Sequence, residues 1–243
     1  MKKLTFLIAI LVFGACGSSR EYVQNPVDTL IKEMDKEPDF TVILFDMKEE
    51  GSFSTTYKHM YKVIKPAKTD DAKPVSTTTD WKEVSKDFFF QHEGDMGMEI
   101  ASKKDGKVTK QTAPPGYSNY VGNQKYGQWQ SRSDGTSFWA FYGQYAFMSN
   151  MLGLMGGPVY RRSYTDYNTN YRGTRPYYGG TTSKPLYGTY SSTALKQNPK
   201  SNFASKVQSR TSRSSGTSAS RSGSRYSSGS SSRSRSSSSR GGK

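Results

Sequence analysis

The charged and apolar residues of this 243-residue chain are divided unevenly, and the division limits how much of it can form a packed core. Residues 1–160 hold 19 Lys and Arg and 19 Asp and Glu, so their charges cancel. Residues 161–243 hold 16 Lys and Arg against one acid, Asp166, which accounts for the net charge of +15. Hydrophobic residues make up only 33% of the chain, less than a globular protein usually has. The sequence therefore predicts a neutral folded part and a basic arm.

The N-terminus has the three parts of an export signal. Two lysines follow the first Met, and an apolar run, 4–13, comes next. This run is too short to span a bilayer as a mature helix, which takes about 20 residues. Gly14 and Ala15 then precede Cys16, the one cysteine of the chain. We expect residues 1–15 to be a signal peptide that is removed by a cut before Cys16.

The end of this segment resembles the lipobox of bacterial lipoproteins, in which an apolar stretch ends in two small residues and a cysteine. Gly14, Ala15 and Cys16 match it, whereas Phe13 stands where the lipobox usually has Leu. The resemblance implies diacylglycerol on the Cys16 sulfur and a fatty acid on its amino group, enough lipid for stable anchoring. Gly17 replaces the Asp of the inner-membrane retention signal, so we expect the outer membrane if the cell is diderm. An ordinary secretory leader is the alternative.

Residues 25–134 carry the patterns of one small α+β domain, with a short antiparallel sheet and one or two helices. The segment 16–24 is its lipidated tether. Asn25 and Pro26 predict a helix start, because Asn caps helices and Pro suits their first position. Apolar residues then recur at spacings of three and four, which is typical of one helix face.

Strand patterns follow this helix. The β-branched and aromatic run 40–45 predicts a buried strand, and 53–64 predicts its hairpin partner. The polar segment 65–80 contains two prolines and predicts a loop, while 81–92 predicts a second helix. A further hairpin is expected around 104–107, where the sequence Lys-Asp-Gly-Lys is a turn signature.

The remaining chain has three segments of unusual composition. Residues 135–160 carry no charge, and we expect an aromatic helix packed on the domain or on a partner; a helix in the membrane interface and a true span are alternatives. Residues 161–190 combine tyrosine, arginine and glycine with few aliphatic residues, so we expect no core there. Residues 191–243 are rich in serine and arginine, which predicts a disordered tail that is dispensable for folding.

Groups that could carry catalysis are scarce. The chain has two histidines, and His92 with Glu93 and Asp95 could offer metal ligands, but their spacing matches no known site. The sequence has no phosphate-binding loop and no Gly-x-Ser-x-Gly elbow. Lipidation would also consume the thiol of Cys16. We therefore expect no catalysis, no metal and no cofactor.

The basic, tyrosine-rich C-terminal part is the one feature that indicates a type of ligand. Arginine attracts polyanions, and tyrosine faces can stack on bases or sugars. Export removes the chain from RNA, so we expect no specific nucleic acid. Anionic lipids and envelope polymers remain as partners, bound weakly and in a salt-sensitive way. The candidate polyanion-binding residues are Arg161, Arg162, Arg172, Arg175, Arg210, Arg213, Arg221 and Arg225.

The composition of the C-terminal part is similar to that of some uncharacterised enterobacterial lipoproteins. These pair an aromatic, Met- and Gly-rich segment, here 137–157, with a Tyr-Gly stretch, here 187–190, and a Ser/Arg/Gly end. The likeness implies no activity. The sequence predicts an envelope lipoprotein with a structural or interaction role, and the alternative is a binding module for an anionic glycan or lipid. A defined pocket lined by polar groups in the domain would favour the binding module.

Overall fold

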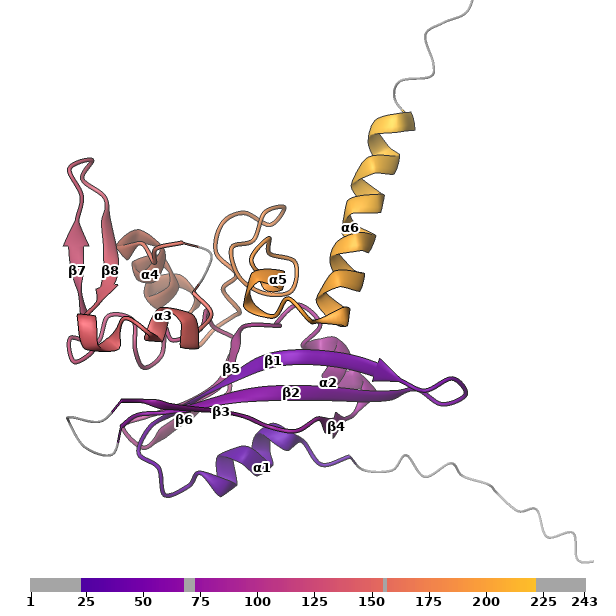
Figure 1. Cartoon of the computed structure of the whole chain (residues 1–243), viewed down its shortest axis with the longest axis horizontal. Helices are drawn as coiled ribbons and strands as arrows, with labels where there is room; N and C mark the ends of the chain where they lie inside the picture. Colours follow the sequence, from indigo (N-terminus) through magenta and orange to yellow (C-terminus); the bar gives the residue numbers. More distant parts are fainter. Residues whose placement is uncertain (1–22, 68–72, 155–156, 222–243) are drawn as a thin grey trace, which may run out of the picture.

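The structure is a computed structural model that describes residues 23–67, 73–154 and 157–221, without the side chains of 213–221. It has the expected α+β class (Figure 1). The helices are α1 (Pro26–Glu33), α2 (Lys86–Gln91), α3 (Met148–Met151), α4 (Arg161–Asp166), α5 (Ala194–Gln197) and α6 (Asn202–Arg221), with short 3-10 and π turns at Gly143–Tyr145 and Tyr167–Tyr171. The strands are β1 (Phe40–Glu50), β2 (Thr56–Lys65), β3 (Val75–Thr78), β4 (Lys82–Val84), β5 (Glu99–Lys104), β6 (Lys107–Thr109), β7 (Gly127–Ser131) and β8 (Ser137–Phe141).

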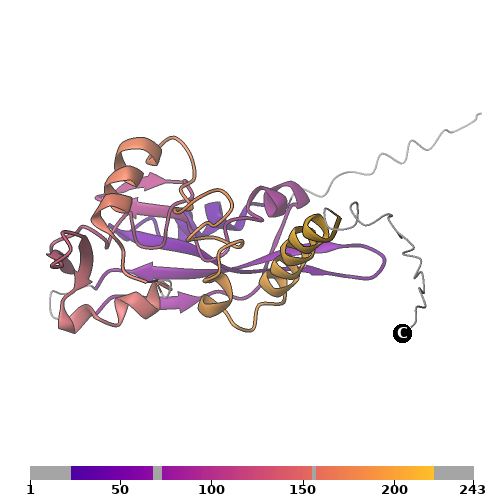
Figure 2. The ribbon, with the colours of Figure 1, turned by 90° about the horizontal axis from the view of Figure 1, so that it is seen from above.

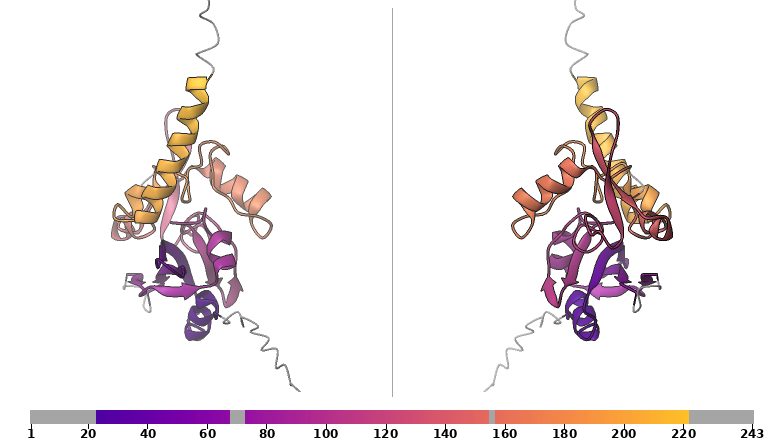
Figure 3. Two further views of the ribbon diagram at one scale, coloured as in Figure 1. Left: turned by 90° about the vertical axis from the view of Figure 1, so that its right-hand side faces the viewer. Right: turned by 90° about the vertical axis from the view of Figure 1, so that its left-hand side faces the viewer.

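The main sheet is antiparallel, with the strand order β3-β2-β1-β5-β6, and β4 pairs with β2 beside β3. A separate hairpin joins β7 and β8. Helix α1 lies on one side of the main sheet, and α4 and α6 lie on the other (Figures 1 and 3). Seen from above, the chain after β6 covers much of that second side (Figure 2).

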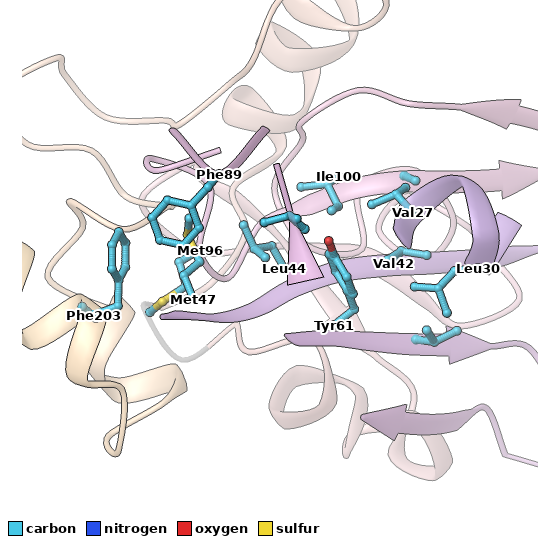
Figure 4. Close-up of a cluster of buried hydrophobic side chains, with 14 of the residues drawn as sticks. Val27, Leu30, Val42, Leu44, Met47, Tyr61, Phe89, Met96, Ile100 and Phe203 are labelled. Atoms are coloured by element: carbon cyan, nitrogen blue, oxygen red, sulfur yellow. The ribbon is translucent and has the colours of Figure 1, made fainter. Parts of the chain in front are cut away.

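The central strand β1 is buried on both faces because its side chains pack in two hydrophobic clusters. Phe40, Val42 and Leu44 belong to a cluster that runs from α1 past β1 to α2 and the base of α6 (Figure 4). Ile43 points to the opposite face, as alternation along a strand requires, and packs in a second cluster with side chains such as Met148. This explains why the run 40–45 has no polar positions except a buried threonine.

Several sequence predictions are confirmed by the backbone. The side chain of Asn25 accepts a hydrogen bond from the Val27 amide at 2.9 Å and begins α1. Strands β1 and β2 form the expected hairpin. At the second hairpin, Asp105 and Gly106 have φ values of 50° and 77°, the positive values that a type I′ turn requires.

Two expectations next to β2 are wrong. The segment 65–80 contains β3, which pairs with β2 although its four side chains are exposed; an exposed edge strand shows no hydrophobic alternation. Residues 81–92 are not one helix, because 82–84 form β4 before Ser85 caps α2 by accepting from the Phe88 amide at 3.2 Å. The cap was readable in the sequence, but the pairing with β2 was not.

The expected aromatic helix over 135–160 is also wrong. Its first residues form β8, which pairs with β7, so the predicted boundary at residue 134 falls within the turn of a hairpin. In this hairpin Trp129 lies directly opposite Trp139, and their ring centroids are 5.1 Å apart. Among the residues that the structure describes, no helix is both long and apolar enough to cross a membrane.

The prediction that 161–190 forms no core is wrong. Tyr167 and Tyr177 are buried in a third cluster with Tyr117, Trp139 and Val159. Tyrosine rings supply the apolar surface that aliphatic residues would otherwise give, and they pack edge to face as aromatic rings prefer.

The prediction that the chain is disordered from residue 191 onward is also wrong for the described residues, which run to Arg221. Helix α6 rises from the main sheet, and Phe203, Ala204 and Val207 at its base are buried in the first cluster. Their spacing is that of a helix face, but frequent serine hides it. Cys16 and the residues after Arg221 lie outside the described part of the chain, so the predicted signal peptide and the end of the tail stay predictions.

Candidate ligand-binding pockets

A pocket of about 540 Å³ opens beside the β5–β6 hairpin, and we call it the cationic pocket. This volume lies within the range of small-molecule binding sites. Three cationic side chains and several hydroxyl groups line it, namely Lys104, Lys107, Arg172, Ser102, Thr109 and Ser118. Asp105 is the only acidic residue in its lining, so positive charge dominates.

The hairpin turn places two of the cations. Lys104 and Lys107 are cross-strand partners on either side of the turn. Like charges directly opposite each other destabilise a hairpin unless a counter-charge is present. Both side chains are exposed, and neither forms an ion pair within the described part of the chain. The pair is therefore a place where an anion from outside would relieve repulsion.

Gln111 positions the third cation. Its Nε2 donates to the carbonyls of Tyr171 at 2.8 Å and Arg175 at 3.0 Å, and its Oε1 accepts from the Gly173 amide at 2.5 Å. These bonds fix the loop 171–175 against the strand edge. The side chain of Arg172 is thereby held at the cationic pocket, where it also donates to the side-chain oxygen Oδ1 of Asn168 at 3.1 Å.

A buried carboxyl, whose charge depends on pH, adjoins this pocket. Glu99 is fully buried, and its neighbours include the hydroxyls of Ser102 and Ser118, which line the cationic pocket. Burial raises the pKa of Glu99 to about 7, against the smaller lowering effect of those hydroxyls and nearby amides. A protonated Glu99 adds no negative charge, so the pocket keeps its cationic character in mildly acidic solution.

A second pocket, of about 470 Å³, shares Gln111 with the first and contains Lys110, Arg175 and His92. The Nδ1 of His92 lies 2.7 Å from Oδ2 of buried Asp95. Asp95 also accepts hydrogen bonds from other side chains, which occupy both of its oxygens. The described residues contain no group of three or more His, Cys, Asp or Glu that could hold a metal ion.

The predicted polyanion-binding arginines are distributed rather than gathered. Arg161 and Arg162 line a third pocket of about 910 Å³, Arg172 lines the cationic pocket, and Arg175 lines the second. Arg210 is exposed on α6. Arg213 and Arg221 lie within α6 but their side chains are not described, and Arg225 and Cys16 lie outside the described residues.

Lys104 and Lys107 were missed as candidate binding residues. The sequence shows them only as the flanks of a turn signature. That signature contains the signal, however, because a type I′ turn puts its two flanking residues opposite each other on one face of the hairpin. Their meeting with Arg172 was not readable, since it depends on the long-range bonds of Gln111.

No family model matches this chain, and neither a curated protein nor a solved structure is similar enough to count as a match. The functional interpretation therefore depends on the geometry and chemistry of the pockets.

Proposed function

We propose that this protein is a lipid-anchored binding module of the cell envelope that holds an anionic glycan or lipid head group in the cationic pocket, without catalysing a reaction. The convergence of Lys104, Lys107 and Arg172 on one pocket carries this proposal. A defined polar pocket favours a binding module over a purely structural role. The shared chemistry of the ligand is a phosphate or carboxylate group.

The residue types suit such an anion. Arginine can donate two parallel hydrogen bonds to a phosphate or carboxylate, whereas lysine acts as a compact point charge. The exposed hydroxyl of Thr109 can donate a further bond to the same oxygens or to a sugar hydroxyl. Because the lysines are exposed, binding should weaken as salt is added.

Lipid on Cys16 would bring this pocket to its ligand. The anchor would confine the protein to a membrane surface, with the outer membrane expected in a diderm cell. Lysine and arginine residues on α6 and beyond would add a weak long-range attraction to the same anionic surface.

The test compares two variants of equal charge. The triple variant Lys104→Ala, Lys107→Ala, Arg172→Ala empties the pocket of cations, and the control Lys36→Ala, Lys82→Ala, Lys86→Ala removes three exposed lysines that lie outside the pockets described above. Each basic residue near an anionic surface contributes about 1 kcal/mol, so the triple variant should bind roughly a hundredfold more weakly. The control should lose far less.

Both variants are made in the mature chain from Gly17 without lipid, since the anchor would itself hold the protein on vesicles. One arm measures co-sedimentation with phosphatidylglycerol vesicles, and the other measures titration with soluble polygalacturonate. Binding of one probe but not the other identifies a lipid or a glycan as the source of the anion. Equal losses in the pocket and control variants would contradict a specific pocket and leave only net charge.

A further inference from the structure

A separate pocket of about 430 Å³ is formed almost entirely by the segment predicted to have no core, and we call it the tyrosine pocket. Its volume is within the range of small-ligand sites. Five tyrosines and one acid are prominent in its lining, namely Tyr171, Tyr177, Tyr178, Tyr187, Tyr190 and Asp166. It shares no residue with the cationic pocket.

The loop that forms this pocket is fixed to the body of the protein. Buried Thr189 donates from its amide to the Gly94 carbonyl at 2.9 Å and from its hydroxyl to the Glu93 carbonyl at 2.6 Å. The same hydroxyl accepts from the Met96 amide at 3.1 Å. Gly188 has a φ of 84°, and a Cβ there would lie 2.4 Å from the Gly94 carbonyl oxygen. The close approach therefore requires glycine, and it fixes the loop against the turn at 93–96.

Two of the five tyrosines are held by their hydroxyl groups. The Tyr178 hydroxyl donates to Asp95 at 2.6 Å, and the hydroxyls of Tyr187 and Tyr117 lie 3.1 Å apart. Since these hydroxyls are engaged by the protein, the rings offer mainly carbon to the pocket. Tyr190 differs, because 49% of its surface is exposed. The lining is thus rigid aromatic surface with one accessible ring at its edge.

Polar groups at the rim complement these rings. Asp166 accepts a hydrogen bond from the Asn170 side chain at 2.8 Å through Oδ1, which leaves Oδ2 available to a ligand. Thr181 and Thr182 add exposed hydroxyls. A carboxylate accepts hydrogen bonds, and hydroxyls both donate and accept them. The pocket therefore suits a ligand that combines C–H surface with several hydroxyl groups.

From this combination we propose that the tyrosine pocket binds a pyranose unit of a neutral or N-acetylated oligosaccharide. One face of a pyranose ring presents C–H groups that pack on aromatic carbon, and its equatorial hydroxyls can donate to Asp166. Proline-rich peptides also dock in aromatic grooves. Proline side chains have no hydrogen-bond donor for the Asp166 carboxylate, whereas sugar hydroxyls do. The polar groups at the rim therefore favour the sugar.

The experiment titrates the full mature chain with maltotriose and with N,N′,N″-triacetylchitotriose at millimolar concentrations, and follows ligand binding by saturation-transfer NMR. At least one saccharide binds the wild type. Tyr190→Ala removes the accessible ring and Asp166→Asn weakens the acceptor, and each lowers affinity about tenfold. Both sites are partly or largely exposed, so the melting temperature stays close to that of the wild type.

The matched control is Tyr142→Ala, an exposed tyrosine outside every pocket described here, which leaves affinity unchanged. A decaproline peptide is titrated in parallel. The proposal is overturned if neither saccharide binds, if only decaproline binds, or if Tyr190→Ala and Asp166→Asn bind like the control. Because the two pockets share no residue, these outcomes are independent of binding in the cationic pocket.

Discussion

Two buried ionisable residues have pKa values displaced in opposite senses. Burial raises the pKa of Glu99 from 4.5 to about 7. Burial, aided by the nearby His92, lowers the pKa of His59 from 6.5 to about 3. His59 is packed among aromatic rings, with Nδ1 3.1 Å from the Tyr61 hydroxyl. Each residue is therefore largely neutral in the fold over a pH range where its unfolded form would be charged, between 4.5 and about 7 for Glu99 and between about 3 and 6.5 for His59.

These shifts predict opposed contributions to stability. The contribution of Glu99 is complete below its unfolded pKa of 4.5 and is lost as pH rises through about 7. The contribution of His59 is complete above 6.5 and is lost as pH falls toward about 3. In Glu99→Gln only the histidine effect remains, so the free energy of unfolding should rise between pH 4.5 and 6.5, relative to wild type, by up to about 1.4 kcal/mol per pH unit. Urea unfolding of both proteins between pH 4.5 and 6.5 measures this difference. If the free energy of unfolding changes with pH in the same way in both proteins, the pKa shift assigned to Glu99 is contradicted.

Among the elements, α6 shows how a serine-rich segment can still belong to a core. A register shift in β1 lies beside Asp46, whose carboxylate is buried. This carboxylate accepts from the Ser201 hydroxyl at 2.6 Å and from the Asn198 side chain at 3.0 Å. Ser201 in turn accepts from the Ala204 amide at 3.1 Å, in the first turn of α6. The helix start is therefore tied to the central strand by polar bonds as well as by Phe203.

The docking of α6 predicts that truncation near Tyr190 destabilises the protein, contrary to the expectation of a dispensable tail. A sharper test is Phe203→Ala, which removes a ring that packs on Phe89 at a centroid distance of 5.5 Å. Such a loss typically costs about 3–5 kcal/mol. The control is Phe53→Ala, since Phe53 is fully exposed in the β1–β2 turn and its loss should change stability little. Thermal unfolding of the full mature chain measures both effects, and Phe203→Ala should melt at a lower temperature than Phe53→Ala. Equal melting temperatures for both variants would mean that α6 does not pack on the core.

The elements that could be predicted from sequence are those with local signals. The cap of α1, the β1–β2 hairpin and the turn before β6 depend on neighbouring residues and are confirmed. The elements that could not be predicted depend on distant partners. Strand β3 is exposed and exists only through β2, and α6 needs β1 and Asp46. Its base buries only a few apolar side chains, so composition concealed it.

At the scale of the whole molecule, the two halves that differ in composition form one packed structure. The segment 161–190 contributes to the third cluster and to all four pockets described above. Its arginines were predicted as anion-binding residues from charge alone, and Arg172 does line the cationic pocket. Its tyrosines were predicted only as possible stacking surfaces. Their gathering into a pocket could not be read from sequence, because it requires the clamp between Thr189 and the turn at 93–96.

We expect the proposed lipid anchor to be separable from the fold, because α1 begins at Pro26, after the predicted tether 16–24. Cys16→Ala should therefore abolish labelling by a fatty-acid probe and block maturation in cells, while the unlipidated chain from Gly17 keeps the melting temperature and the pocket binding proposed above. Ser18→Ala, beyond the cysteine, leaves the lipobox residues intact and should label and sediment with membranes like the wild type. Labelling and membrane sedimentation that persist in Cys16→Ala would refute the lipoprotein assignment, and the apolar leader would then be an ordinary secretory signal.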